Sequence, residues 1–276
     1  MCFLNKSYLC FFSFCMLLAL LPVFADAMDR SGAPKPGVRM EKTIPGPDGL
    51  QMEATLIIPV GAGPFPAVLI LPGGNGAKLT GVVYPHHVDF GWKLVEQGFV
   101  AMVLNYRDTS RFFMDERWVT DIEAALDTLE SQKSVDTSRI FLVGFSMGGT
   151  NALRVAARRH EVSGLVCYFS PVLFPPKPGI RRSHSFSQPL DLVDSLRCPL
   201  LILQGDADPI TEPHQSELFE VRTRERGIPV TRILFPGGKH GFTYRGVSGG
   251  RVEFNQALTD SAFHEVLRFI HNKDKQ

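Results

Sequence analysis

The chain has 276 residues, of which 44% are hydrophobic and 21% are charged, a balance typical of one globular α/β domain. Lys plus Arg number 29 and Asp plus Glu number 28, so the net charge is only +1. Nucleic acids and anionic membrane surfaces bind proteins through an excess of basic residues, and this near-neutral balance excludes them as expected partners. We therefore expect a small-molecule partner.

The N-terminal segment has the pattern of a signal peptide. An apolar run over residues 9–21 follows Lys6, and a small-x-small sequence ends at Ala27. A transmembrane anchor is the alternative, but the run is shorter than the roughly 20 apolar residues that a spanning helix needs. We expect residues 1–27 to be cleaved as a signal peptide. The protein would then be exported, to the periplasm or the medium, and would keep no stable membrane span.

The remaining chain is expected to form one domain. Residues 28–37 are small and rich in proline, which is typical of a flexible lead-in, and residues 38–276 are expected to form a single catalytic domain. Cys167 and Cys198 are the only cysteines beyond the signal peptide. Both lie in apolar runs, which predicts buried thiols, with a single bridge as the alternative in an oxidising compartment.

Hydrophobic patterning predicts the architecture. Two strands joined by a turn are expected first, over residues 39–44 and 50–58. Short apolar runs typical of strands buried on both faces of a parallel sheet then recur, at residues 67–71, 99–104, 140–143, 164–169, 200–203 and 231–235. Segments of helical period lie between or after these runs, notably residues 118–129 and 263–270. Because parallel strands need crossover connections, this alternation predicts a mainly parallel sheet with helices on both faces.

One stretch, residues 171–194, matches neither element type. It contains Pro171, Pro175, Pro176, Pro178 and Pro189, so a long loop or a short irregular cap is expected. In sheets of this class, ligands bind at the carboxyl ends of the strands. A lid over that edge and a solvated excursion are both open interpretations of the stretch.

The pentapeptide at residues 144–148, Gly-Phe-Ser-Met-Gly, has the pattern G-x-S-x-G. A predicted strand precedes it, and residues 149–159 can form a helix. In this context the glycines permit a sharp strand-to-helix turn that lifts Ser146 into the open, at a helix N-terminus that favours negative charge on an attacked carbonyl. The pattern predicts a nucleophilic serine, with a helix-capping serine as the alternative.

A serine hydroxyl needs a neighbouring base to become a nucleophile. Of the eight histidines, His240 lies in a glycine-rich loop directly after the last predicted strand, at the carboxyl edge of the sheet. His86 and His87 lack further ligands at a suitable spacing and are interpreted as surface residues rather than a metal pair. We predict that His240 is the general base, the alternative being a loop histidine with a structural hydrogen bond.

Two carboxylates follow the strand at residues 200–203, namely Asp206 and Asp208. Since Gly205 ends this strand, Asp208 can turn back toward the imidazole, whereas Asp206 is expected to cap the turn. We predict that Asp208 is the orienting acid and keep Asp206 as the alternative. The resulting chain order of serine, aspartate and histidine is that of the α/β-hydrolase triad.

An oxyanion hole needs two convergent backbone N–H groups. We expect one from Met147, directly after the nucleophile, and the other from Gly74 or Asn75 in the small-residue loop after the strand at residues 67–71. A flexible turn is the alternative for this loop. The sequence contains no H-E-x-x-H, C-x-x-C, Walker A or strand-G-x-G-x-x-G pattern, so neither a cofactor nor a metal is expected.

Three segments together resemble the dienelactone hydrolase family of the α/β hydrolases: residues 144–149, 205–209 and 239–242. The likeness covers roughly residues 38–272. It implies the α/β-hydrolase fold, with a mostly parallel, eight-stranded sheet and a triad on Ser146, Asp208 and His240. The namesake enzymes use cysteine as nucleophile, so the resemblance implies the hydrolase machinery without dienelactone as the substrate.

The leading hypothesis is a serine hydrolase that cleaves small esters or lactones through an acyl-enzyme. Ser146 attacks the carbonyl, His240 takes the proton and Asp208 fixes the imidazole tautomer. A peptidase similar to the prolyl oligopeptidase catalytic domain is the alternative among enzymes. A non-catalytic binding protein on the same scaffold is a further alternative, although such a protein would not need all three triad positions.

The signal-peptide hypothesis predicts the N-terminus of the mature protein. When the full chain is produced in a bacterial host, intact-mass analysis of the exported fraction is expected to show a chain that begins at Met28. Ala27→Arg places a large charged residue at the cleavage site and is expected to leave the leader attached. An exported wild-type chain that retains residues 1–27 would contradict the hypothesis.

Overall fold

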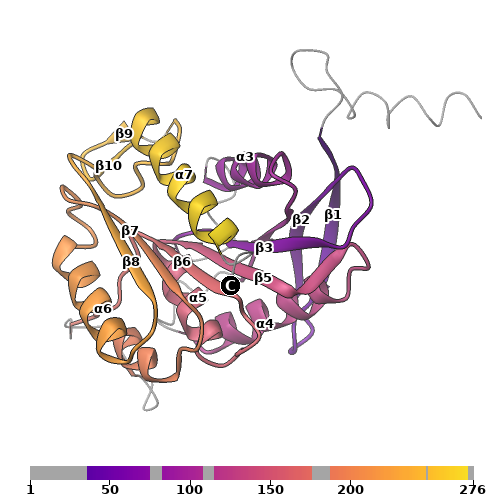
Figure 1. Cartoon of the computed structure of the whole chain (residues 1–276), viewed down its shortest axis with the longest axis horizontal. Coiled ribbons are helices and arrows are strands. Elements are labelled where there is room, and N and C mark those ends of the chain that lie inside the picture. Colours follow the sequence, from indigo (N-terminus) through magenta and orange to yellow (C-terminus); the bar gives the residue numbers. More distant parts are fainter. Residues whose placement is uncertain (1–35, 75–82, 108–114, 176–186, 247, 273–276) are drawn as a thin grey trace, which may run out of the picture.

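A single mixed sheet organises the protein. The computed structural model describes residues 36–74, 83–107, 115–175, 187–246 and 248–272. Within them, eight strands form one sheet in the order β1-β2-β4-β3-β5-β6-β7-β8 (Figure 1). The strands are β1 (Gly37–Pro45), β2 (Gln51–Pro59), β3 (Phe65–Leu71), β4 (Val100–Asn105), β5 (Val135–Phe145), β6 (Gly164–Tyr168), β7 (Leu200–Gly205) and β8 (Val230–Phe235). The predicted fold class is confirmed.

Two strand pairings at one side of the sheet are antiparallel. β1 pairs with β2, and β2 with β4, in antiparallel register. The expected turn joins β1 to β2: the Gly46 N–H donates to Leu50 O at 2.6 Å, and Gly49 has a φ of 83°, which favours glycine. From β4 to β8 every pairing is parallel, so these strands end at the same edge.

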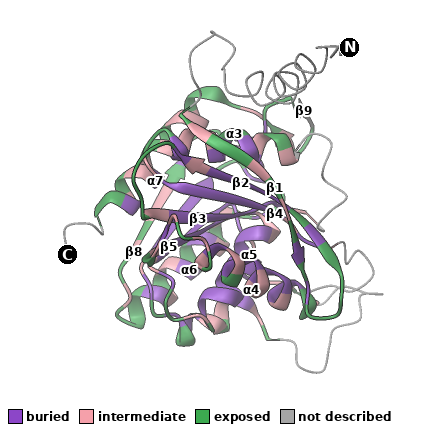
Figure 2. Cartoon of the chain, turned by 90° about the vertical axis from the view of Figure 1, so that its right-hand side faces the viewer, coloured by how far each residue is buried: buried purple, intermediate pink, exposed green. Residues whose placement is uncertain are grey.

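Helices cover both faces of the sheet, as the crossover argument predicts (Figure 1). They are α3 (Val83–Val95), α4 (Arg117–Glu130), α5 (Met147–Ala156), α6 (Pro213–Glu225) and α7 (Gln256–Asn272). Alternate residues of β3 face opposite ways: Leu69 joins the core formed with α4, α5 and α6, whereas Val68 and Ile70 join the core formed with α3 and α7. Figure 2 shows the buried central strands between these helix layers.

Parts of the sequence-based expectation fall outside the described residues. These are the signal peptide at residues 1–27, residues 28–35 of the lead-in, and residues 176–186 of the irregular stretch. Gly37, expected in the lead-in, already belongs to β1. In the part of the chain that the structure describes, no helix is long and apolar enough to cross a membrane.

The described ends of the irregular stretch are ordered by glutamine side chains. The Gln188 amide bonds both backbone groups of Phe174, at 2.8 and 3.0 Å, and the Gln215 side-chain oxygen accepts from the Val172 N–H at 3.0 Å. Residues Pro189–Ser195 form a 3-10 helix, η2, where a loop or irregular cap was expected. Pro189 lies at the start of this helix, where a backbone N–H would have no partner within the helix and its absence costs nothing.

The two cysteines of the domain, Cys167 and Cys198, are buried thiols that are not joined by a disulfide, as the sequence predicted. Cys167, in β6, lies with its Sγ 3.7 Å from Gly149 O, and burial raises the pKa of its thiol well above the ordinary value. The disulfide alternative is not formed. A protonated, solvent-shielded thiol of this kind is chemically inert and acts as a small hydrophobic side chain.

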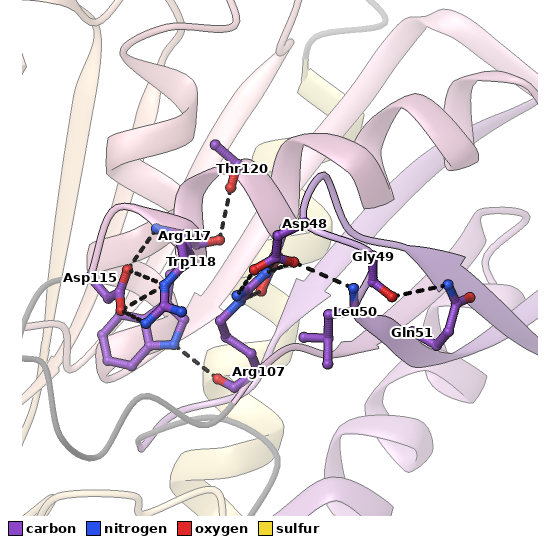
Figure 3. Close-up of polar contacts among 10 residues, drawn as sticks. Asp48, Gly49, Leu50, Gln51, Arg107, Asp115, Arg117, Trp118 and Thr120 are labelled. Atoms are coloured by element: carbon purple, nitrogen blue, oxygen red, sulfur yellow. Dashed lines mark hydrogen bonds and ion pairs between the residues drawn. The ribbon is translucent and has the colours of Figure 1, made fainter.

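Arg107 joins three elements just beyond the end of β4 (Figure 3). Its guanidinium makes two bonds of 2.6 Å to Asp121 of α4 and two bonds, of 2.6 and 2.8 Å, to Asp48 of the β1–β2 turn. The Asp121 side chain is completely buried. The bond to Arg107 also holds the pKa of Asp48 well below its usual range. The Trp118 indole donates to Arg107 O at 2.9 Å. We call these contacts of Arg107 with Asp48, Asp121 and Trp118 the Arg107 clamp, because they hold the turn and the helix to the end of β4.

Two substitutions that break the Arg107 clamp are expected to reduce stability by different amounts. Arg107→Met leaves the buried Asp121 carboxylate without its partner and should lower the free energy of unfolding by about 3 kcal/mol, as measured by urea titration. Asp48→Asn removes a half-exposed partner and should have a much smaller effect, because solvent screens that charge. Equal losses in the two variants would contradict this account of the clamp.

Candidate active site

The turn between β5 and α5 displays Ser146 at the carboxyl edge of the sheet. β5 ends at Phe145 and α5 begins at Met147, earlier than the helix start expected at residue 149. Ser146 between them has φ 52° and ψ −122°, a strained conformation for a residue with a side chain. Its N–H donates to Tyr168 O of β6 at 2.8 Å, which fixes the turn against the neighbouring strand.

Glycines on either side of the serine are required by close packing. A Cβ added at Gly144 would lie 2.5 Å from the carbonyl carbon of Gly148, and one added at Gly148 would lie 2.5 Å from Pro72 O. Both contacts are with backbone atoms that cannot move aside. The steric role that the G-x-S-x-G pattern predicts for its glycines is therefore confirmed, and helix α5 packs directly against the end of β3.

The structure brings the three predicted triad residues together. His240, in the loop after β8, has Nε2 3.0 Å from Ser146 Oγ and Nδ1 2.8 Å from Asp208 Oδ2. Asp208 and His240 are buried, with 3% and 6% of their surfaces exposed. Since Nδ1 donates to the carboxylate, Nε2 is left to accept the serine proton. Three residues far apart in the sequence thus form one hydrogen-bonded chain.

Several neighbours hold the Asp208 carboxylate in place. Its Oδ1 accepts the backbone N–H groups of Ile210 and Thr211 at 2.8 and 2.9 Å, and its Oδ2 accepts the Gln204 amide at 3.2 Å. Sequence reasoning missed Gln204, although a polar residue within an otherwise apolar strand was a usable signal. With both oxygens occupied, the carboxylate is fixed toward His240.

Asp206, the alternative acid, does not contact the imidazole. Its Oδ1 accepts the Gly237 N–H at 2.6 Å and so joins the loop after β7 to the loop after β8. A Cβ at Gly205 would lie 2.5 Å from the carbonyl carbon of Gly238, which shows how closely these loops approach. Asp206 is thus not the acid that orients His240, but its side chain bridges to the loop after β8 instead of capping its own turn, as was predicted. Its hydrogen bond stabilises the loop that carries His240.

An aromatic shell formed by Phe169 and Phe242 packs beside His240, and the sequence analysis did not identify it. Phe169, directly after β6, has a φ of 37°, and its ring lies edge-on to that of His240 with 4.9 Å between centroids. Its N–H donates to Leu203 O at 2.7 Å. Phe242 also packs against Phe169, with 5.6 Å between ring centroids. This shell excludes water from the buried side of the imidazole.

The interpretation of His86 and His87 as surface residues is wrong. His87 is completely buried, and its ring packs edge-on to Phe145 with 4.6 Å between centroids. Burial lowers the pKa of His86 to about 4, and the positive charges of Lys93 and Arg245 act in the same direction, so this ring is neutral near pH 7. Within the described ranges, no group of three or more His, Cys, Asp or Glu side chains could hold a metal ion.

The loop after β3 lies beside the nucleophile, where an oxyanion hole was expected. Met147 is the first residue of α5, so its N–H has no acceptor within the helix. A Cβ at Gly73 would lie 3.0 Å from Ser146 Cβ, and Gly74 has a φ of 77°. The Tyr106 hydroxyl donates to Pro72 O at 2.5 Å and anchors the loop. Asn75, the other candidate donor, lies outside the described residues.

The fold and the site together define an α/β hydrolase: a mostly parallel sheet carries a serine at a strand-to-helix turn and a histidine and an aspartate at the neighbouring strand ends. The chain belongs to the dienelactone hydrolase family, whose family model matches residues 52–273. The resemblance carried by the three sequence segments is therefore confirmed.

Individual relatives are distant. A Bradyrhizobium protein named "Probable 2-oxo-3-(5-oxofuran-2-ylidene)propanoate lactonase" is 25% identical over 212 residues, covering 71% of this chain and 81% of that protein. Esterase EstD of Thermotoga maritima is 24% identical over 196 residues, covering 66% of this chain and 47% of that protein. The crystal structure of the carboxylesterase Cest-2923 from Lactobacillus plantarum shares the fold, with a TM-score of 0.70, 17% identity and coverage of 86% and 98%. Family and relatives support hydrolase activity.

The two neighbouring carboxylates allow a matched test of the site. Asp208→Asn would favour the wrong imidazole tautomer and is expected to reduce kcat for p-nitrophenyl acetate by on the order of 10³–10⁴-fold. Asp206→Asn keeps a side-chain oxygen that can accept the Gly237 N–H, so this variant should stay within a few-fold of the wild type. The site assignment fails if the two variants lose activity equally, or if Asp206→Asn alone is inactive.

Proposed function

We propose that the protein is a serine hydrolase that cleaves small carboxylic esters or lactones through an acyl-enzyme. The observation that carries this proposal is the pair of distances within the triad, 3.0 Å from Ser146 Oγ to His240 Nε2 and 2.8 Å from His240 Nδ1 to Asp208 Oδ2. Both lie within the range needed for proton transfer to a general base and for orientation of that base. Membership of a hydrolase family supports the same chemistry.

In the proposed mechanism, Ser146 Oγ attacks the acyl carbonyl carbon while its proton moves to His240 Nε2. The carbonyl π electrons move to the oxygen, which the N–H groups of Met147 and Gly74 stabilise. The imidazolium then gives its proton to the leaving alkoxide, and an acyl-serine remains. Water, deprotonated by the same imidazole, attacks this ester and releases the acid, which restores the serine. Asp208 remains ionised and stabilises the imidazolium throughout.

The N-terminal sequence pattern supports a further proposal about location. Residues 1–27 combine a basic residue, an apolar run and a small-x-small site, and we propose that the enzyme acts after export. Its substrates would then be small esters or lactones outside the cytoplasm.

Labelling by a fluorophosphonate probe tests for the activated serine directly. The mature wild-type protein is expected to be labelled and to hydrolyse p-nitrophenyl acetate, whereas Ser146→Ala and His240→Ala should abolish labelling and reduce kcat by on the order of 10⁵-fold or more. Circular dichroism should show that both variants fold, because each change shortens a side chain at the edge of the sheet.

Other outcomes would support the alternatives. A folded wild-type protein that neither reacts with the probe nor turns over any ester would favour a non-catalytic binding protein. Cleavage of peptide p-nitroanilides without ester hydrolysis would favour a peptidase. Undiminished labelling of Ser146→Ala would identify a different nucleophile and would refute the proposed triad.

A further inference from the structure

Tyr244 carries a buried hydroxyl whose position the triad does not explain. The residue lies in the loop that follows His240, and 7% of its surface is exposed. Its Oη is fully buried, and among the described residues it has no hydrogen-bond partner. An unpaired buried hydroxyl destabilises the folded protein, and phenylalanine in the same place would avoid that cost. The hydroxyl therefore calls for an interaction that the described residues do not supply.

The hydroxyl lies against the loop expected to form the oxyanion hole. A Cβ added at Gly73 would lie 2.9 Å from Tyr244 Oη, 3.0 Å from Ser146 Cβ and 2.9 Å from Phe145 O. The phenol oxygen and the nucleophile therefore approach the same glycine, one residue before the candidate donor Gly74. A side chain at this position would collide with all three atoms, so only glycine allows the phenol oxygen to lie this near the carbon that bears the attacking oxygen.

A tight turn and ring packing hold the phenol in this position. The Tyr244 N–H donates to Gly241 O at 2.8 Å, and Gly241 has a φ of 62°. A Cβ at Gly241 would lie 2.5 Å from Tyr244 Cδ2, so the turn closes directly over the ring. The ring also packs edge-on to His86 and Phe169, with centroids 5.6 and 5.7 Å away. The hydroxyl is thus held in place before any substrate binds.

We propose that the Tyr244 hydroxyl is a third donor to the oxyanion, alongside the backbone N–H groups of Met147 and Gly74. This inference rests on the proposed serine-hydrolase function. As the bond from Ser146 Oγ to the acyl carbon forms, the serine proton moves to His240 Nε2 and the carbonyl π electrons move to the oxygen. Tyr244 keeps its proton and donates a hydrogen bond to that oxygen, so no further reactant is needed.

Two properties of the site suit the hydroxyl to this role. Burial raises the pKa of Tyr244 well above the ordinary phenol value, so the group stays protonated and remains a donor at any working pH. No residue in the described ranges bonds this hydroxyl, so a developing oxyanion gains the bond without displacing any of them. An interaction made only in the transition state lowers the barrier without tightening substrate binding.

The variant Tyr244→Phe removes the hydroxyl and keeps the ring. For p-nitrophenyl acetate, kcat is expected to fall by about 10²–10³-fold, the effect typical of one lost oxyanion donor, while KM stays within about twofold. The inhibition constant of a trifluoromethyl ketone, which forms a tetrahedral oxyanion on the serine, should rise by a similar factor. The melting temperature should not fall, because an unpaired polar atom has been removed.

Tyr168→Phe is the matched control. It also removes a phenol hydroxyl from a buried ring of the same aromatic cluster, and Tyr168 packs on Phe145 with centroids 4.4 Å apart. Its side chain lines a cavity of about 220 Å³ between α3 and α7 whose lining includes none of the triad residues. The substitution keeps the Tyr168 backbone oxygen that accepts the Ser146 N–H and the ring that packs on Phe145. Activity and ketone inhibition of this variant are therefore expected to match the wild type within a few-fold.

The outcomes separate this inference from the proposed function. If Tyr244→Phe keeps wild-type kcat and ketone inhibition while the wild-type Ser146 is labelled and active, the hydroxyl has no role in the oxyanion hole and only this inference is overturned. A loss of melting temperature with matching changes in kcat and KM would show a structural role and would also overturn it. A wild-type protein without labelling or turnover would overturn both proposals.

Discussion

The strained turn at Ser146 is the constraint on which the rest of the site depends. A side-chain-bearing residue with φ 52° costs free energy, and the surrounding backbone must hold it there. It does so through the bond from the Ser146 N–H to Tyr168 O and through glycines that let β3, β5 and α5 approach closely. Phe169, with a φ of 37°, is the other non-glycine residue with positive φ in the described ranges. Both strained residues belong to the candidate active site.

Parallel pairing explains how the other functional groups reach this turn. β5, β6, β7 and β8 lie side by side and end at the same edge (Figure 1). The segments after them contribute Ser146, Phe169, Asp208 and His240 in that order. Each loop is then tied to its neighbour, as Asp206 ties the loop after β7 to Gly237 after β8. The sheet sets the spacing of the triad, and short loop contacts fix its orientation.

The triad could be predicted because its signals are local. G-x-S-x-G, the Gly-Asp-x-Asp loop and the glycine-rich histidine loop each follow a predicted strand, and parallel strands bring such loops to one edge. Helix boundaries were less predictable: α5 begins at Met147 because the strained turn passes directly into the helix, a geometry that residue types alone do not reveal.

Contacts between distant segments could not be derived in the same way. Phe169 and Tyr244 are ordinary aromatic residues in sequence, and their roles depend on contacts with His240 and Gly73 in other loops. The misplaced His87 had a usable signal, since it shares a helical face with the buried residues Phe90 and Leu94 of α3. Its helical spacing from Phe90 and Leu94 predicts a buried position, whereas its residue type alone suggests the surface.

The Gly241 turn has a consequence for how the enzyme can be controlled. It joins His240 and Tyr244 within one compact segment, so a movement of this backbone segment displaces both side chains together. If Tyr244 is an oxyanion donor, a movement of this segment removes the base and that donor in the same event. The population of molecules would then divide between competent and incompetent forms, and anything that binds or modifies this loop would change the number of working enzymes rather than the rate of each.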